Sequence, residues 1–177
     1  MDPGDFPASK DQCEWFYRRV EAIADTVSGL NSGWFEPERR GSYDSYNLVA
    51  EAGRDLGFGD DRLRLALNAA GIQEGLKVED MDVAVSVASR RLGIDPAALR
   101  ERATSDEVRA RVDLSTAQFK ALGVGQRPTF VIEDAIGDKA ILSGLFRPAP
   151  LIATLQAMFA DEAGYAAYAE RHGRPPA

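Results

Sequence analysis

The chain carries the pattern of β-strands at only one place. Thr129–Ile132 and Ala140–Ser143 are short runs of β-branched and apolar residues, and the segment 133–138 between them is rich in turn formers. Two strands cannot form a stable sheet by themselves. We therefore expect a mostly helical protein whose hairpin finds further strand partners in residues 1–8, in residues 30–42 or in a partner subunit.

Helical spacing of apolar residues accounts for most of the rest of the chain. Ser9–Gln12 has the pattern of a capping box, and apolar residues then recur at helical offsets from Cys13 to Val27. This first helix is predicted to end at Gly29 or Asn31. Five further helices are predicted at about 44–56, 60–74, 80–92, 96–103 and 105–122.

Capping residues mark several helix ends. Asp95–Pro96 is an N-cap followed by proline at the first helical position, and Thr104–Glu107 has the pattern of a second capping box. Gly123 is placed to end the helix that begins there. The segment 30–44 has no period, and we expect an ordered loop because its two aromatic residues, Trp34 and Phe35, need burial.

Two helices are predicted at the C-terminal end. The first follows Pro148 and carries apolar residues on one face from Leu151 to Phe159. The second is predicted to begin at Asp161, a candidate N-cap, and to carry Tyr165 and Tyr168.

Charge and composition limit the classes of partner. The chain has 177 residues, a net charge of −7 and a pI of about 4.8, and an acidic surface repels nucleic acid and anionic membranes. No apolar run approaches the roughly 18 residues of a membrane span. The first residues lack the basic and apolar stretches of a signal peptide. We therefore expect no nucleic-acid or membrane partner, and a cytoplasmic location.

The chain has one cysteine, Cys13, and one histidine, His172. One cysteine excludes an intramolecular disulfide, and two such residues cannot supply the ligands of a Cys/His metal site. His172 lies in a Gly/Pro-rich tail that is expected to fray, which disfavours a Cys–His catalytic pair. Cys13 lies on the apolar stripe of its own helix and is interpreted as structural, with a monothiol role as the alternative. We assign no catalytic residue, no metal and no cofactor from these residues.

The most informative motif lies around Pro128. Residues 121–132 read Ala-Leu-Gly-Val-Gly-Gln-Arg-Pro-Thr-Phe-Val-Ile, and they are followed by Ala140–Gly144 and by the helix after Pro148. This order resembles the DsbA-like branch of the thioredoxin fold. The helices before it resemble the helical insertion of that branch, and Gly71–Gly75 matches a short link found in FrnE-type members. The resemblance covers residues 43–160 approximately and extends more distantly to 2-hydroxychromene-2-carboxylate isomerases and kappa-class glutathione transferases.

The resemblance implies a fold and a division of the chain. The fold would be α/β and mostly helical, with the C-terminal half of a thioredoxin-like fold, a β-hairpin plus helices, joined to a DsbA-type helical insertion. Residues 1–43 would form an N-terminal helix and irregular loop, 44–122 the insertion, and 123–177 the thioredoxin-like unit and tail.

The resemblance also implies a substrate-binding site at Arg127, Pro128 and Thr129. The corresponding proline of the family is cis, which would turn the backbone of Arg127 toward a sheet edge where an extended peptide can pair. The alternative is that Pro128 only begins a strand, where proline is tolerated. The guanidinium of Arg127 would favour anionic substrates, pair with a carboxylate such as Glu133, or be solvated.

The dithiol of the family is missing. Thiol–disulfide exchange needs an activated thiolate, usually within Cys-x-x-Cys after a first strand, and this sequence has neither. The first seven residues resemble the segment that follows the family's second strand. The sequence thus resembles a member that begins after the first β-α-β unit, through a misplaced start or a truncation.

Three functions stay open from the sequence. The first is a DsbA/FrnE-like thiol–disulfide oxidoreductase, truncated or degenerate, acting on protein or peptide thiols and disulfides. The second is a glutathione-dependent isomerase or transferase, which would use glutathione. The third is a non-catalytic peptide-binding module. A homodimer is compatible with all three.

Overall fold

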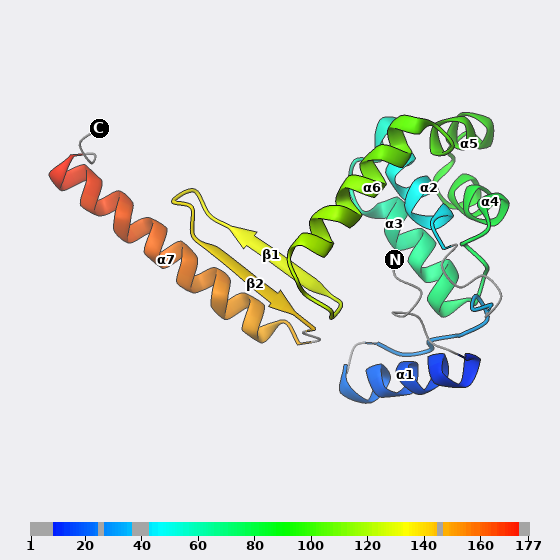
Figure 1. Cartoon of the computed structure of the whole chain (residues 1–177), viewed down its shortest axis with the longest axis horizontal. Coiled ribbons are helices and arrows are strands. Elements are labelled where there is room, and N and C mark those ends of the chain that lie inside the picture. The colour runs from blue at the N-terminus through cyan, green and yellow to red at the C-terminus, as the bar shows by residue number, and fades with distance from the viewer. Residues whose placement is uncertain (1–8, 25–26, 37–42, 145–146, 174–177) are drawn as a thin grey trace. The chain divides into compact units, whose positions relative to one another are not determined.

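The computed structural model describes residues 9–24, 27–36, 43–144 and 147–173. Over these residues the chain is mostly helical with one antiparallel pair of strands, which confirms the mixed α/β class predicted from the sequence (Figure 1). The chain divides into two compact units, Met1–Ala121 (unit 1) and Leu122–Ala177 (unit 2). Among the described helices, none combines the length and apolarity required to cross a membrane.

The regular structure of unit 1 is helical throughout the residues that are described. The predicted helix over 60–74 is an α-helix, α3 (Arg62–Asn68), that continues as one turn of π-helix, η3 (Ala69–Gln73). In chain order the elements are α1 (Lys10–Ile23), α2 (Ser45–Asp55), α3 (Arg62–Asn68), η3 (Ala69–Gln73), α4 (Met81–Leu92), α5 (Pro96–Ala103) and α6 (Asp106–Ala121).

The first helix begins as predicted but ends earlier. The hydroxyl of Ser9 accepts a hydrogen bond from the backbone N–H of Gln12 at 3.2 Å, which makes Ser9 the N-cap. The helix ends at Ile23, because Ala24 is extended with φ −104° and ψ 100°. The prediction of an end at Gly29 or Asn31 is therefore wrong.

Residues 27–36, called the return segment here, run back along α1 and reach η3. The Ser32 hydroxyl donates to the Glu14 carboxylate at 2.7 Å, and the Asn31 N–H donates to the Ile72 carbonyl at 2.7 Å. Phe35 is buried, at 5% exposure, as expected for an ordered loop. The apolar residues continue at helical spacing beyond Ile23, but the tertiary contacts of the return segment favour an end of α1 at Ile23. Part of the expected loop, 37–42, lies outside the described residues, as do residues 1–8.

The core of unit 1 lies among α2 to α6. The central helix is α2, which packs against α3, α4, α5 and α6, while α3 also packs against α4. Apolar residues at helical spacing on each helix meet there, as the sequence pattern requires. The core includes Leu48, Val49, Ala52, Leu63, Leu67, Ala70, Val85, Val87, Ala88, Leu99, Ala103 and Val108.

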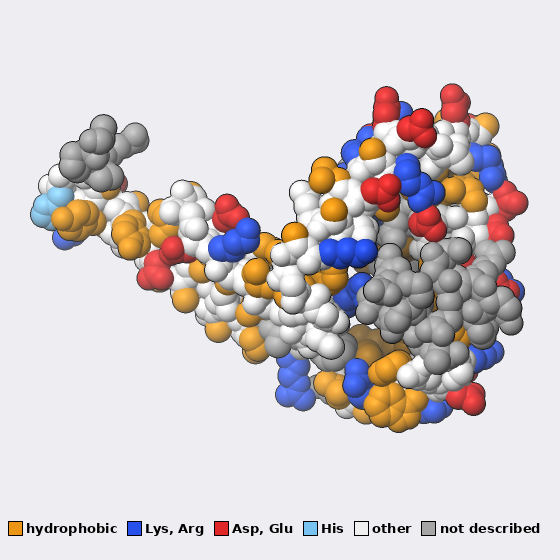
Figure 2. Space-filling model, viewed as in Figure 1, with side chains coloured by type: hydrophobic (Ala, Val, Ile, Leu, Met, Phe, Trp, Pro, Cys, Tyr) orange, Lys and Arg blue, Asp and Glu red, His pale blue; other side chains and the backbone are white. Residues whose placement is uncertain are grey.

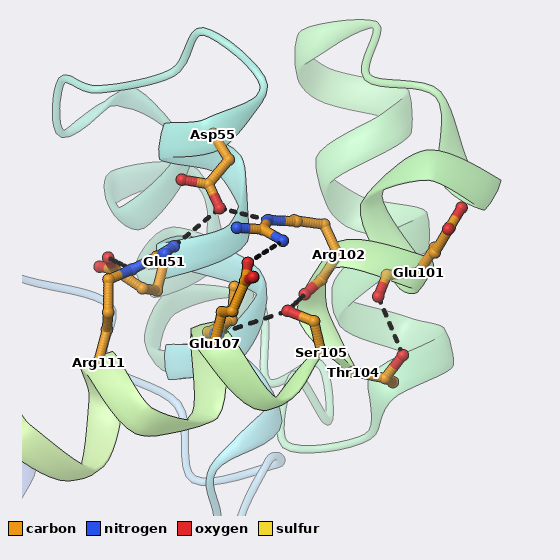
Figure 3. A network of polar contacts seen from close by, with 9 residues as sticks. Glu51, Asp55, Glu101, Arg102, Thr104, Ser105, Glu107 and Arg111 are labelled. Carbon is orange, nitrogen blue, oxygen red and sulfur yellow. Dashed lines mark hydrogen bonds and ion pairs between the residues drawn. The ribbon is translucent and has the colours of Figure 1, made fainter.

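A network of charged side chains fastens α2 to α5 and α6 (Figure 3). The Asp55 carboxylate accepts hydrogen bonds from Arg102 and, at 2.8 Å, from Arg111. Arg111 also pairs with Glu51 at 2.8 Å, and Arg102 with Glu107 at 2.6 Å. Hydrogen bonds from Arg111 and Arg102 lower the pKa of Asp55, so this carboxylate stays charged at neutral pH. The network supports the helical core and is not a candidate site, because every acid in it has a basic partner.

The N-terminus of α6 is capped one residue later than predicted. The hydroxyl of Ser105 accepts from the Val108 N–H at 3.3 Å. The Thr104 hydroxyl instead donates to the carbonyl of Arg100 at 3.0 Å, at the end of α5. Both residues can cap a helix, and the tight α5–α6 turn decides which of them does so.

Unit 2 contains β1 (Thr129–Glu133), β2 (Lys139–Ser143) and α7 (Ala149–His172). The strands are antiparallel, with Thr129 opposite Ser143 and Glu133 opposite Lys139. The single helix α7 replaces the two helices predicted from the sequence. Asp161 lies inside α7 and is not an N-cap, because the residues around it continue the helix without a break. An acidic residue before an Ala-rich stretch resembles an N-cap but does not itself end the helix before it.

Candidate functional site

The corner where the chain enters β1 is fixed by hydrogen bonds to two backbone carbonyls. The carbonyl of Gln126 accepts from the hydroxyls of Thr129 at 2.7 Å and Ser143 at 3.2 Å. The Gly144 N–H donates to the carbonyl of Pro128 at 2.8 Å. Gly144 has φ +77°, a conformation that glycine adopts readily and other residues rarely adopt. The start of β1 and the end of β2 are therefore held together from both sides.

The three predicted binding residues lie at this corner. The Arg127–Pro128 peptide bond is cis, as the resemblance predicted. Arg127 and Pro128 are exposed, and Thr129 is half-buried because its hydroxyl is used in the corner. Glu133, one of the carboxylates considered for Arg127, forms an ion pair with Lys139 at 3.2 Å across the hairpin.

The turn at the other end of the hairpin is built around Asp134. Its carboxylate accepts from the N–H groups of Ile136 at 3.1 Å and Asp138 at 2.9 Å, and its own N–H donates to the Asp138 carbonyl at 3.1 Å. An Asp side chain that satisfies the N–H groups of its own turn is a local device that needs no tertiary contact. The hairpin is therefore fixed at both ends.

The ladder of the hairpin determines which backbone groups face away from it. Pro128 and Gly144 form a hydrogen-bonded pair, and such pairs alternate with non-hydrogen-bonded pairs along an antiparallel ladder. Thr129, Val131 and Glu133 therefore direct their N–H and C=O groups away from β2. Within the part of the chain that the structure describes, β1 has no second strand neighbour. The outer edge of β1 thus offers a row of backbone donors and acceptors.

Apolar side chains flank this edge. Val131 and Ile141 lie opposite each other on one face of the hairpin and are 46% and 42% exposed. Phe130, on the other face, is 37% exposed. A strand edge with exposed apolar residues readily accepts another strand. The arrangement can bind an extended polypeptide through its main chain and one or two apolar side chains.

Cys13 lies in a different environment. Its side chain is 2% exposed and lies near Tyr17, whose hydroxyl accepts a hydrogen bond from the Trp34 indole at 2.6 Å. Burial raises the pKa of the Cys13 thiol, although a hydrogen bond with Tyr17 opposes the rise. Burial also raises the pKa of Tyr17. A buried, protonated thiol is neither a nucleophile nor a good metal ligand, so Cys13 contributes packing.

The thiol of Cys13 should resist modification while the chain is folded. We expect its reaction with 5,5′-dithiobis(2-nitrobenzoic acid) to be about a hundredfold slower in the native protein than in urea, because the thiol must first be exposed by opening of the structure. Absorbance of the released thiolate measures both rates, and Cys13→Ser gives the background. Equal rates in the native and unfolded chain would show that the thiol is accessible.

The sequence did not single out two features that shape these sites. For the contacts among Cys13, Tyr17 and Trp34, the sequence indicated only that the aromatic pair Trp34 and Phe35 needs burial. Nothing in the sequence indicated the role of the Gln126 carbonyl, because every residue has a backbone carbonyl. No group of three or more residues able to hold a metal ion occurs among the described side chains.

Comparisons of this chain with protein-family models, with curated proteins and with solved structures found no match.

Proposed function

We propose that this chain is a relative of the DsbA/FrnE-type thiol–disulfide oxidoreductases and that its own residues perform the binding part of that activity. In this proposal an extended segment of a protein or peptide substrate adds as a strand to the outer edge of β1. The observation that carries the proposal is the row of outward-facing backbone groups at Thr129, Val131 and Glu133, beside the exposed Arg127 and Pro128.

The chemistry of the edge suits a wide range of peptide sequences. Main-chain hydrogen bonds are the same for every residue, so they supply affinity without selecting a sequence. Val131 and Ile141 add a small apolar surface, which favours a bound segment with an apolar residue at one position. Substrates of this kind are unfolded or loop segments of other proteins.

The redox step itself is not assigned to residues of this chain. Attack on a substrate disulfide needs a thiolate, and the one cysteine is buried with a raised pKa. The proposal therefore limits the activity of this chain to holding the substrate. Two observations support the proposal. One is the outer edge of β1, and the other is the order of the helices and the hairpin along the chain, which resembles that of the DsbA-like branch.

Proline scanning of the two outer edges tests the proposal. The N–H of Val131 faces away from β2, so Val131→Pro removes a donor from the outer edge and spares the ladder within the hairpin. Ile141 is the matched control, because its N–H faces outward from the other strand and Ile141→Pro makes the same change on the edge of β2. The probe is reduced, carboxymethylated α-lactalbumin, a permanently unfolded chain, and its binding is followed by calorimetry.

We expect Val131→Pro to weaken binding of this probe about tenfold, because one main-chain hydrogen bond and the apolar contact of Val131 are lost. Ile141→Pro also removes an apolar side chain but takes no donor from the outer edge of β1, so it should weaken binding by no more than about twofold. Circular dichroism and thermal unfolding serve to check that both variants are folded. The proposal fails if the wild type does not bind the probe, if Val131→Pro binds it normally, or if Ile141→Pro alone loses binding.

A further inference from the structure

Helix α7 is much longer than the strands of its unit. It has 24 residues, or about 36 Å, whereas each strand has five residues, or about 17 Å. Met158 is the buried residue of α7, and after it most positions as far as His172 are exposed. Figure 2 shows hydrophobic side chains lying on the surface along this helix. The C-terminal half of α7 therefore has little tertiary packing, although packing supplies most of the stability of a helix in water.

One row of side chains, called the stripe here, runs along both halves of α7. Its members are spaced three or four residues apart, the spacing of a helix seam that packs against another helix. In the first half of α7 these residues are buried or half-buried, and in the second half they are exposed. The stripe consists of Leu151, Thr154, Met158, Asp161, Tyr165, Tyr168 and His172.

The exposed part of the stripe, Asp161, Tyr165, Tyr168 and His172, is called the seam here. Tyr165 and Tyr168 are each 64% exposed, so both rings lie largely in solvent on one face of the helix. The rings of Tyr168 and His172 lie against each other, with their centroids 4.4 Å apart. The seam therefore presents two phenol rings, a carboxylate at one end and an imidazole at the other.

We propose that the seam binds the seam of a second copy of this chain, with the two helices antiparallel. An antiparallel pair centred between Tyr165 and Tyr168 places Tyr165 opposite the partner's Tyr168. The same register places Asp161 opposite the partner's His172. Because the arrangement is twofold symmetric, each of these pairs occurs twice.

Charge complementarity selects this arrangement. An imidazole donates a hydrogen bond to a carboxylate whether it is neutral or protonated, so Asp161 and the partner's His172 suit each other. A parallel pair would instead place Asp161 opposite the partner's Asp161, and like charges in contact repel. Gly164 beside the seam has no atom near its missing side chain, so the second helix can approach closely there.

The contact is small, and its strength should be modest. An interface of about three helical turns is well below the size of a standard stable complex and belongs to the weak, transient class. We therefore expect a monomer–dimer equilibrium with a dissociation constant on the order of 10–100 µM.

Sedimentation equilibrium of the full chain tests the proposal. The wild type should dimerise between about 5 and 500 µM. Asp161→Lys, which removes the acceptor and adds a cation opposite the partner's His172, should weaken the dimer at least about tenfold. The double variant Asp161→Lys/His172→Glu reverses both ends of the seam and should restore the dimer.

Phe159→Ala is the matched control. Phe159 is 63% exposed on the same helix but lies outside the seam, so its removal should leave the equilibrium unchanged. All altered residues are exposed, and far-ultraviolet circular dichroism checks that the helix is intact. The proposal is overturned if the wild type is monomeric at about 500 µM, if the double variant does not regain the dimer, or if Phe159→Ala abolishes it.

Discussion

Replacing Leu67 with alanine should destabilise unit 1 by about 2–5 kcal/mol. Leu67 lies in α3, is 0% exposed and is among the largest fully buried side chains of the core. The substitution removes three buried carbon atoms and leaves a cavity, because the helices around it are fixed by their other contacts. This cost is a large fraction of the roughly 5–15 kcal/mol that typically stabilises a domain, so we expect the variant to be partly unfolded at about 37 °C.

Leu65 supplies the control on the same helix. It lies two residues before Leu67 and is 62% exposed, so Leu65→Ala should change stability by no more than about 0.5 kcal/mol. Urea unfolding gives the stabilities of both variants. It is followed by circular dichroism and by tryptophan fluorescence, since Trp15 and Trp34 belong to unit 1. Equal midpoints for the two variants would mean that α3 is not packed as the structure shows.

Local signals predicted the elements that depend on local interactions. Asp95 caps α5 with a 2.7 Å bond to the Ala98 N–H, as its position before a proline indicated. The hairpin is found where the β-branched runs and the turn formers lie, because Asp134 closes that turn with its own side chain. The cis bond before Pro128 was likewise predicted, through the resemblance carried by the residues around it.

Features that depend on distant contacts could not be predicted in the same way. The stripe of α1 continues past Ile23, but hydrogen bonds from the return segment, such as Leu30 N–H to the Glu21 carboxylate at 2.8 Å, favour an earlier end. At η3, which continues α3, the chain passes close to Val78, since a Cβ atom on Gly71 would meet the Val78 side chain at 3.0 Å. Periodicity carries no information about either contact.

The candidate site was predicted in part for the same reason. The sequence predicted Arg127, Pro128 and Thr129 as candidate binding residues, since they belong to one continuous motif. It did not identify Val131 as the centre of the outer edge, because the direction of each N–H depends on the register with β2. It also did not reveal that Thr129 and Ser143 bind the Gln126 carbonyl together, which requires both strands to be in place.

Gly53 in α2 provides the second large effect, and here the structure reverses the expectation from helix propensity. Alanine favours a helix interior over glycine by about 0.5–1 kcal/mol, so propensity alone predicts that Gly53→Ala is stabilising. However, a Cβ atom at Gly53 would lie 2.2 Å from Cδ2 of Leu63, and Leu63 is only 1% exposed. A side chain enclosed on all sides cannot turn away without displacing its neighbours. We expect the overpacked variant to lose about 1–3 kcal/mol, measured as a lower urea midpoint.

Gly59 makes the comparison decisive because the same substitution there should have the opposite sign. It lies in the connection between α2 and α3, has no positive φ, and has no atom within 4 Å of the position that a Cβ would take. Gly59→Ala removes conformational freedom from the unfolded chain without a clash, so it should stabilise the protein by about 0.4–1 kcal/mol. If Gly53→Ala were as stabilising as Gly59→Ala, then α2 and α3 would not approach each other closely at Gly53. Since both α2 and α3 contribute residues to the core, the packing of unit 1 would then have to differ from the arrangement in Figure 1.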